Sequence, residues 1–403
     1  MKRGVTRSRI YDILVIAGSV CAAAALIRWP RESVAAARQG LRLCIDVLIP
    51  TLFPYFVLSS LMIGTGAARE LGRLAEPVMR RLFRIRGVAA PALVLGYVGG
   101  YPVGAKTVIE LHRSGELSRG EAERLLAFCN NSGPAFILGV AGAGVFASGR
   151  IGAMLYLAHV ISSLIVGILF RGRGPMAIPE RAKVVRSVSR PRFAAVFTDS
   201  VRGAFGGVIR LSGFVVFFTV LIRILLISGL IPAAAGILGR LLSPFGADAA
   251  WAERLITGMI ELTSGVWSLR GAGNAGPTVA MAAFMLGWAG VSVHCQTLSY
   301  ISDSDLSARC YFTGKLLHGL ISAGIIGLIS RLDLLGVPAA AYYAGQVESI
   351  AALNFFSALT AACCTAGGLW AVGAFYMKYR TWRRAQRSES GPTAPERRLN
   401  GSR

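Results

Sequence analysis

Four polar segments interrupt apolar stretches of the chain, at residues 99–106, 129–134, 261–265 and 292–296. Backbone without regular hydrogen bonding survives inside a bilayer only where protein buries it or where it lines a wet cavity. The open helix ends at such interruptions offer N–H groups to anions and carbonyl groups to cations. Interruptions at corresponding places in two halves of a chain are typical of the binding site of a transporter.

The first two segments combine backbone freedom with polar side chains. Lys106 follows a Gly- and Pro-rich break, and a lysine inside a membrane is costly unless it is hydrated or paired, which favours a role in binding. The alternative is that Lys106 extends to the interface near His112 and Arg113. The consecutive amides of Asn130 and Asn131 suit a polar organic solute or a coordinated ion, and an ordinary interfacial turn is their alternative.

The third segment places a carboxylate beside two hydroxyl groups. Glu261, followed by Thr263 and Ser264, could take up a proton or coordinate Na⁺ and so couple transport to an ion gradient. Structural pairing of Glu261 with an arginine such as Arg223 is an equal alternative. The fourth segment contains His294.

These segments define the predicted substrate-binding residues. They are Gly100, Tyr101, Pro102, Lys106, Asn130, Asn131, Ser132, Glu261, Thr263, Ser264, His294 and Gln296.

No motif predicts catalysis, a cofactor or a metal centre. His294 and Cys295 are adjacent, but one such pair without further ligand spacing does not predict a metal site. The seven cysteines show no CxxC spacing, so neither a disulfide framework nor a metal centre is expected. Gly142 and Gly144 lack the spacing of a nucleotide-binding loop. We therefore do not expect an enzyme.

The composition predicts an all-α polytopic integral membrane protein with about eight transmembrane helices in two related halves, some broken or re-entrant. Of the 403 residues 54% are hydrophobic and only 16% are charged, whereas a soluble protein carries roughly a quarter. Several apolar stretches reach the roughly 20 residues that cross a bilayer. The clearest are Ile10–Ile27, Ile151–Phe170, Val208–Ile231, Phe312–Ile329 and Ala351–Met377.

The net charge of +23 is explained by the flanks of these stretches rather than by nucleic acid. Four basic residues lie in Met1–Arg9, seven in Arg171–Arg192 and eight in Lys378–Arg403, all bordering apolar stretches. Basic flanks of this kind face the cytoplasm and contact anionic lipids. A bacterial cell membrane location with cytoplasmic termini follows, and nucleic acid is not an expected partner.

A basic connector divides the chain, and the second half contains two short echoes of the first. Residues 71–77 match residues 238–244 at five of seven positions, and residues 95–99 resemble residues 286–290. The predicted organisation is a basic flank and first span (1–30), a first Gate-like repeat (31–170), the cytoplasmic connector (171–200), a second repeat (201–335), a C-terminal span (336–380) and a disordered basic tail (381–403).

Four of these blocks resemble one known family. Leu95–Lys106, Glu121–Pro134, Glu261–Gly265 and Leu286–Gln296 look like the YlbJ-type sporulation integral membrane proteins of the nucleoside-recognition, or Gate-domain, superfamily. The resemblance covers roughly residues 41–329. It implies a role in endospore formation, in the outer forespore membrane, with dipicolinic acid passing from mother cell to forespore.

We therefore expect a transporter for a small anionic metabolite, with a proton or sodium ion as the coupling ion. Lys106 and helix N-termini could receive the carboxylates of dipicolinate. A nucleoside permease, in which Tyr101 stacks on the base, and a non-transporting sporulation scaffold stay open as alternatives. Besides lipid, a second copy of the chain or other sporulation membrane proteins are candidate partners.

Overall fold

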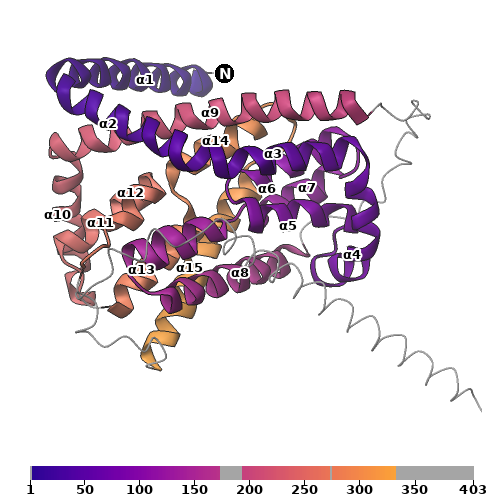
Figure 1. Ribbon diagram of the computed structural model, residues 1–403. Helices are drawn as coiled ribbons and strands as arrows, with labels where there is room; N and C mark the ends of the chain where they lie inside the picture. The colour runs from indigo at the N-terminus through magenta and orange to yellow at the C-terminus, as the bar shows by residue number, and fades with distance from the viewer. Residues whose placement is uncertain (1, 173–192, 273–274, 333–403) are drawn as a thin grey trace, which may run out of the picture.

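The computed structural model describes residues 2–172, 193–272 and 275–332, and within these ranges every regular element is a helix. The predicted all-α class is therefore confirmed. Most of the predicted connector, the predicted C-terminal span and the basic tail lie outside the described residues. Figure 1 labels the helices in chain order.

The described part of the first half contains α1 (Lys2–Arg28), α2 (Pro30–Leu43), η1 (Cys44–Leu48), α3 (Ile49–Gly64), α4 (Ala67–Phe83), η2 (Gly87–Ala89), α5 (Ala90–Gly99), α6 (Val103–Arg113), α7 (Arg119–Leu126), η3 (Ala135–Val145) and α8 (Gly149–Phe170). The second half contains α9 (Phe193–Ile227), α10 (Leu230–Leu242), η4 (Ser243–Phe245), α11 (Ala249–Ile260), α12 (Leu262–Trp267), α13 (Ala275–Trp288), α14 (Gly290–Ile301) and α15 (Arg309–Arg331). Of the η elements, η1 and η3 are π-helical and the other two are short 3₁₀ turns.

Four helices within the described residues are long and apolar enough to cross a membrane: Gly149–Phe170, Phe193–Ile227, Gly276–Ile301 and Arg309–Arg331. A fifth span is formed if Ala67–Phe83 and Gly87–Gly99, which are bent by 98°, count as one. The polytopic class is thus confirmed, while the total of about eight remains a prediction. The first span also remains a prediction, for which Val15–Arg28 of α1 is a shorter apolar helical segment.

The expected spans at Ile151–Phe170 and Phe312–Ile329 lie within α8 and α15. The expected span Val208–Ile231 differs from the structure. There α9 begins already at Phe193 and ends at Ile227, because Gly229 takes a left-handed conformation (φ 80°) before α10 starts.

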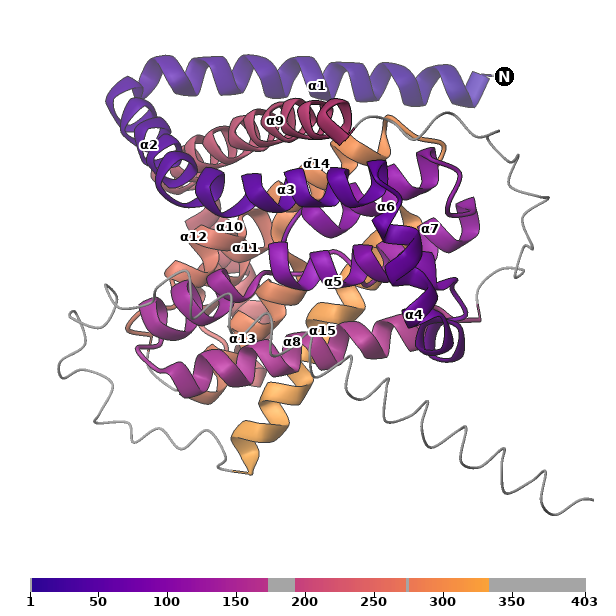
Figure 2. The same ribbon diagram turned by 45° about the vertical axis from the view of Figure 1, so that its right-hand side comes forward.

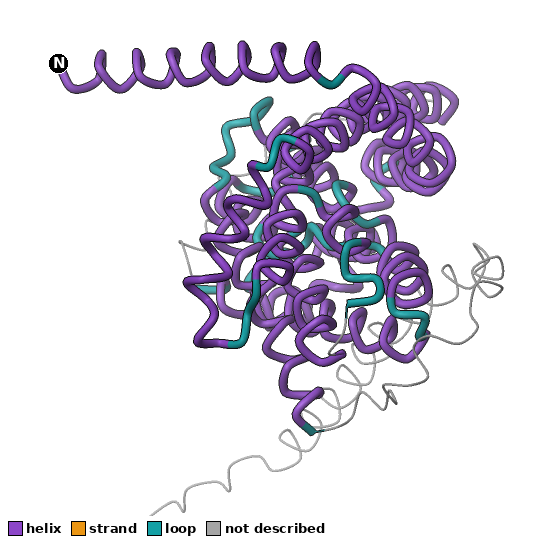
Figure 3. The backbone as a smooth tube through the Cα atoms, turned by 90° about the vertical axis from the view of Figure 1, so that its left-hand side faces the viewer, coloured by secondary structure: helices purple, strands orange, loops and turns teal. Residues whose placement is uncertain are grey.

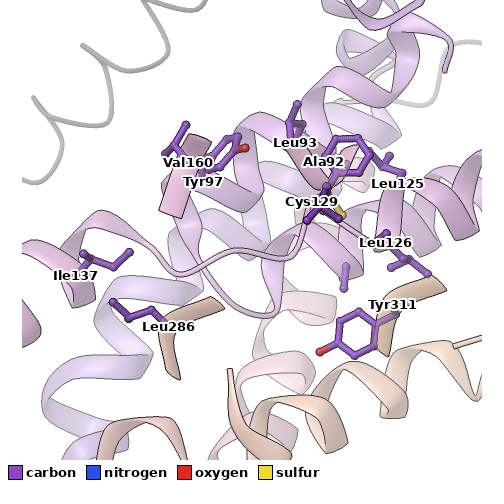
Figure 4. Packing of buried hydrophobic residues seen from close by; sticks show 14 of the residues in the cluster. Ala92, Leu93, Tyr97, Leu125, Leu126, Cys129, Ile137, Val160, Leu286 and Tyr311 are labelled. Atoms are coloured by element: carbon purple, nitrogen blue, oxygen red, sulfur yellow. The ribbon is translucent and has the colours of Figure 1, made fainter. Parts of the chain in front are cut away.

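The helices pack into one body, and the long helix α9 runs along its edge (Figure 1). Helices α2 and α3 pack on α9, and α15 packs along α13 and α8 at the opposite side of the body. Helix α1 runs above α9 in Figure 2, and its N-terminal end projects away from the body in Figure 3. In the core, Cys129 lies among Ala92, Leu125 and Leu126 (Figure 4), so the second polar break begins inside a packed interior.

The two halves place their elements in the same order. The first runs α4, α5, a break, α6, α7, a break, η3 and α8; the second runs α10, α11, a break, α12, α13, a break, α14 and α15. Residues 71–77 lie in α4, and residues 238–244 lie in α10 and the η4 turn after it, so the first echo agrees with this order. The second echo does not, because residues 95–99 end α5 whereas residues 286–290 join α13 to α14.

Two glycines allow the backbone of the first break to lie directly against that of the second. A Cβ atom on Gly96 would lie 1.9 Å from the carbonyl oxygen of Cys129, and one on Gly104 would lie 2.2 Å from the same atom. Neither contact is possible without moving backbone, so α5 and α6 can approach residue 129 only through glycine. The close approach positions both breaks relative to one another.

We expect Gly104→Ala to lower the free energy of unfolding by about 3 kcal/mol, because overpacking a rigid backbone contact has a cost of that order. Thermal unfolding in detergent would measure the effect. Gly120→Ala is the matched control, since a Cβ atom there meets nothing within 4 Å and the change favours helix. Equal melting temperatures for the two variants would contradict the packing argument.

The first turn of α7 contains a capping motif whose carboxylate also binds an arginine. Ser118 and Glu121 form a reciprocal capping box. The carboxylate of Glu121 also accepts hydrogen bonds from the side chain of Arg86 at 2.8–3.1 Å. Burial acts to raise the pKa of Glu121, but the hydrogen bonds from Arg86 and Ser118 outweigh it and hold that pKa below its ordinary value.

Glu121→Gln should therefore destabilise the protein by about 2 kcal/mol at neutral pH, the order of a hydrogen bond to a charged group. A carboxyl group with a lowered pKa contributes stability above its unfolded value of 4.5 and loses it as the pH falls through the folded value. The difference between wild type and variant should thus shrink in melting curves below pH 4.5. Glu70→Gln, which breaks an exposed pair with Arg73, should change stability by less than about 1 kcal/mol.

Candidate functional site

All four predicted polar segments contribute to one cavity of about 170 Å³. The fourth segment is not a break, however, because residues 292–296 lie inside α14 and the helix is interrupted before it, at Ala289. Residues from α3, η1 and α9 complete its apolar wall, including Leu52, Tyr55 and Leu211. The predicted site residues that line it are Gly100, Tyr101, Ser132, Glu261, Thr263 and Gln296. Segments separated by up to 200 residues in the sequence therefore contribute to a single site.

The other predicted residues lie outside this lining: Pro102, Lys106, Asn130, Asn131, Ser264 and His294. Ser264 faces a second cavity on the other side of α12. Asn130, Asn131 and His294 are fully buried behind the cavity wall. Ser292 also lines the cavity, but the predicted site residues did not include it, although it lies in the fourth polar segment, residues 292–296.

One helix, η3, begins at the cavity without a side-chain cap. Its N-cap Pro134 lines the cavity, whereas Pro102 and Ala289, the N-caps of α6 and α14, have no side-chain cap either but do not line it. The N-terminal end of a helix carries a partial positive charge and exposed N–H groups, which attract anions. The second break therefore directs one positive helix end at the cavity.

The partial positive charge at the start of α12 is neutralised by the carboxylate of Glu261. Its two carboxylate oxygens accept hydrogen bonds from the backbone N–H groups of Thr263 at 2.9 Å and Ser264 at 2.6 Å. Glu261 is 8% exposed and belongs to none of the ion pairs among the described residues. The structure thus uses this carboxylate as the N-cap of α12, and Arg223 lines the second cavity instead.

Lys106 is balanced within its own helix. Its Nζ lies 2.5 Å from the carboxylate of Glu110, one turn later on α6, and donates to the Ser60 hydroxyl at 2.7 Å. The sequence shows this partner, because a Lys–Glu pair four residues apart shares a helix face. The charge of Lys106 is therefore compensated away from the cavity.

A second lysine, which the sequence reasoning missed, lies directly behind the cavity wall. Lys315 on α15 is completely buried, and its Nζ donates to the carbonyl oxygen of Asn130 at 2.9 Å. It also contacts the hydroxyl of Tyr101 at 3.4 Å and lies 4.8 Å from the centre of that ring. None of the ion pairs among the described residues involves Lys315.

Two histidines continue this polar chain away from the cavity. His318 Nδ1 lies 3.5 Å from Lys315 Nζ, and its Nε2 lies 2.9 Å from the carbonyl oxygen of His159. The two imidazole rings are 4.3 Å apart, and the N–H of Ser132 donates to His159 Nε2 at 3.0 Å. The available signal was position, because an ionisable residue within an apolar span indicates function by default.

The amides of the second break are held by the second half of the chain. Asn130 Nδ2 donates to the Thr297 hydroxyl at 3.0 Å, which also accepts from Tyr311 at 3.2 Å. His294 Nδ1 lies 2.9 Å from the Tyr311 hydroxyl. This network fixes the break, and in the part of the chain that the structure describes no group of three His, Cys, Asp or Glu residues could hold a metal ion.

The fold and the site define a polytopic helical membrane protein whose broken helices enclose a partly polar cavity. Residues 45–170 match the Gate family, described as nucleoside recognition. The chain is 29% identical over 340 residues to the sporulation integral membrane protein YlbJ of Bacillus subtilis (strain 168), which covers 80% of this chain and 83% of that protein. No solved structure matches. The predicted resemblance to YlbJ-type, Gate-domain proteins is thereby confirmed.

Proposed function

We propose that the chain is a transporter for a small anionic metabolite, dipicolinic acid during sporulation, moved from mother cell to forespore. The observation that carries the proposal is that all four polar segments, two from each half and three of them at helix breaks, contribute to one cavity. Broken helices at such a position supply the binding site in known transporter folds. The similarity to a sporulation membrane protein supports the setting.

The charge and shape of the cavity support an anion with a single aromatic ring. The uncapped start of η3 provides N–H groups for a carboxylate, and Lys315 lies one side chain behind Tyr101. Tyr55, Tyr101 and Phe136 give aromatic surface for a flat ring. At about 170 Å³ the cavity is smaller than the roughly 300–1,000 Å³ of drug-sized sites, which favours a one-ring solute.

Glu261 supports proton coupling in this proposal. A carboxylate beside a bound dianion is repelled by it, so binding of the solute favours protonation of Glu261. Protonation removes the negative cap of α12, whose two N–H groups then lose their charged acceptor. Proton uptake and solute binding would in this way be linked, as the two halves rock about the fixed site.

A nucleoside is the second candidate, and specific residues favour it. Ser132, Thr263 and Gln296 offer neutral hydrogen-bonding groups at the cavity, and the matching family is described as nucleoside recognition. A nucleoside is uncharged, so its binding would not depend on the positive end of η3. The two candidates therefore differ in whether charge on the solute matters.

Uptake of labelled dipicolinate into proteoliposomes tests the proposal, with protein-free liposomes as the control. We expect saturable uptake that an inward-directed proton gradient accelerates and that excess uridine or adenosine leaves unchanged. Competition by a nucleoside would favour the second candidate. Folded, inserted protein that takes up neither solute would contradict transport and favour the scaffold.

A further inference from the structure

A second cavity, of about 600 Å³, adjoins the central one across the short helix α12. Thr263 lines the central cavity, whereas the next residue, Ser264, and Ser268 one turn later line the second. One helix of six residues therefore forms part of the wall of both cavities. Nothing assigned so far to the transport site uses the second cavity.

Basic side chains from three helices gather at this second cavity. Arg31 comes from α2, Arg223 from α9 and Arg254 from α11, and the acidic residues at the same cavity are Glu32 and Glu253. None of the three arginines belongs to an ion pair among the described residues. Arginine binds carboxylates through two parallel hydrogen bonds, so an excess of arginine over glutamate favours an anion with carboxylate groups.

We propose that the second cavity is the outer vestibule of the transport path, a carboxylate-binding site formed by Arg31, Arg223 and Arg254. The proposal rests on the proposed function, because it assigns the vestibule to the same solute. Helix α12 separates the vestibule from the central cavity. A solute collected by the arginines would pass this helix to reach the central cavity.

The attachment of α12 is consistent with a barrier that moves. Its first turn is capped by the Glu261 carboxylate, and no other helix start at the central cavity has such a cap. Its Gly265 packs so closely on Gly258 of α11 that an added Cβ atom would lie 2.0 Å from the Gly258 Cα. Leu262 and Val266 of the same helix are buried in the core, so the carboxylate cap is the attachment of α12 that protonation of Glu261 would weaken.

Charge-selective labelling of Ser268→Cys tests the vestibule directly, without any transport. The probes are methanethiosulfonates that carry either a sulfonate or a trimethylammonium group and form a mixed disulfide with the new thiol. We expect the ratio of anionic to cationic labelling to be higher at Ser268→Cys than at Ser243→Cys, which replaces an exposed serine outside both cavities. The parent chain, with its native cysteines, gives the background.

Adding Arg223→Gln or Arg254→Gln to Ser268→Cys should lower the anionic-to-cationic ratio about ten-fold. Removing one charge at contact distance in water changes each rate about three-fold, in opposite directions for the two probes. Glu253→Gln should raise the ratio, which excludes a general loss of structure as the cause. The ratio at Ser243→Cys should not change with any of these substitutions.

The vestibule would be overturned if the anionic-to-cationic ratio at Ser268→Cys did not change with Arg223→Gln and Arg254→Gln. The same conclusion would follow if neither probe reacted with the thiol. This result leaves the proposed transport function untouched, because uptake is measured separately. If the ratio responds as expected but no solute is taken up, the anion site stands and its assignment to a transport path fails.

Discussion

Replacing Lys315 with methionine should reduce dipicolinate uptake by about 100-fold, while the protein still inserts and remains monodisperse. Methionine preserves the length and apolar stem of lysine but removes the amino group that contacts Tyr101 and the Asn130 carbonyl. A hydrogen bond from a charged group contributes about 1.5–3 kcal/mol, and a factor of 100 corresponds to about 2.7 kcal/mol. Initial uptake rates in proteoliposomes, normalised to inserted protein, would measure it.

The parallel variant Lys106→Met separates the two lysines. Lys106 is compensated by Glu110, so its loss should act mainly on the stability of α6 and lower uptake far less than Lys315→Met. If Lys106→Met abolishes uptake and Lys315→Met does not, the cation that serves the solute belongs to the first break. A melting curve for each variant shows whether lost uptake reflects lost structure.

Replacing Glu261 with glutamine should make uptake insensitive to a proton gradient and reduce its maximal rate about ten-fold. Glutamine has nearly the same shape and can still accept a hydrogen bond at the start of α12, but it can neither carry the charge nor exchange the proton. The ten-fold loss corresponds to about 1.4 kcal/mol. Uptake with and without an imposed proton gradient distinguishes lost coupling from lost binding.

Asp248→Asn is the matched control for Glu261→Gln. Asp248 also caps a helix, because its carboxylate accepts a hydrogen bond from the Trp251 N–H at 2.6 Å at the start of α11. It lines neither cavity. The control should retain gradient-driven uptake. A Glu261→Gln variant that still responds to the proton gradient would remove Glu261 from the coupling step.

The matched Gate domain contains only part of the proposed site. Residues 45–170 supply Tyr101, Ser132 and the start of η3, whereas Glu261, Gln296 and Lys315 come from the second half. The hydrogen bond from Lys315 to the Asn130 carbonyl joins the halves at the second break. Glu261 and Lys315, the charged residues of the proposed site, therefore lie outside the matched residues, in the second half of the chain.

The sequence by itself determined the class of the protein and the places where its helices break. Apolar length predicts spans because the bilayer has a fixed thickness, and Gly, Pro and paired polar residues mark breaks because they interrupt helical hydrogen bonding. Hence the breaks at Tyr101, Ser132 and Glu261 were predicted, and these residues line the cavity, whereas Gln296 lines it from within helix α14. The capping box of Ser118 and Glu121 can also be read from the sequence, because its two partners lie only three residues apart.

Only the tertiary structure decided which polar groups face the solute and which face one another. Lys106 and Lys315 both lie in apolar surroundings, but Lys106 meets Glu110 on its own helix whereas Lys315 meets Asn130 and Tyr101, about 200 residues away. Local spacing reveals the first pairing and carries no information on the second. Long-range contacts depend on how whole helices pack, which here rests on close backbone approaches such as that of Gly104 to Cys129.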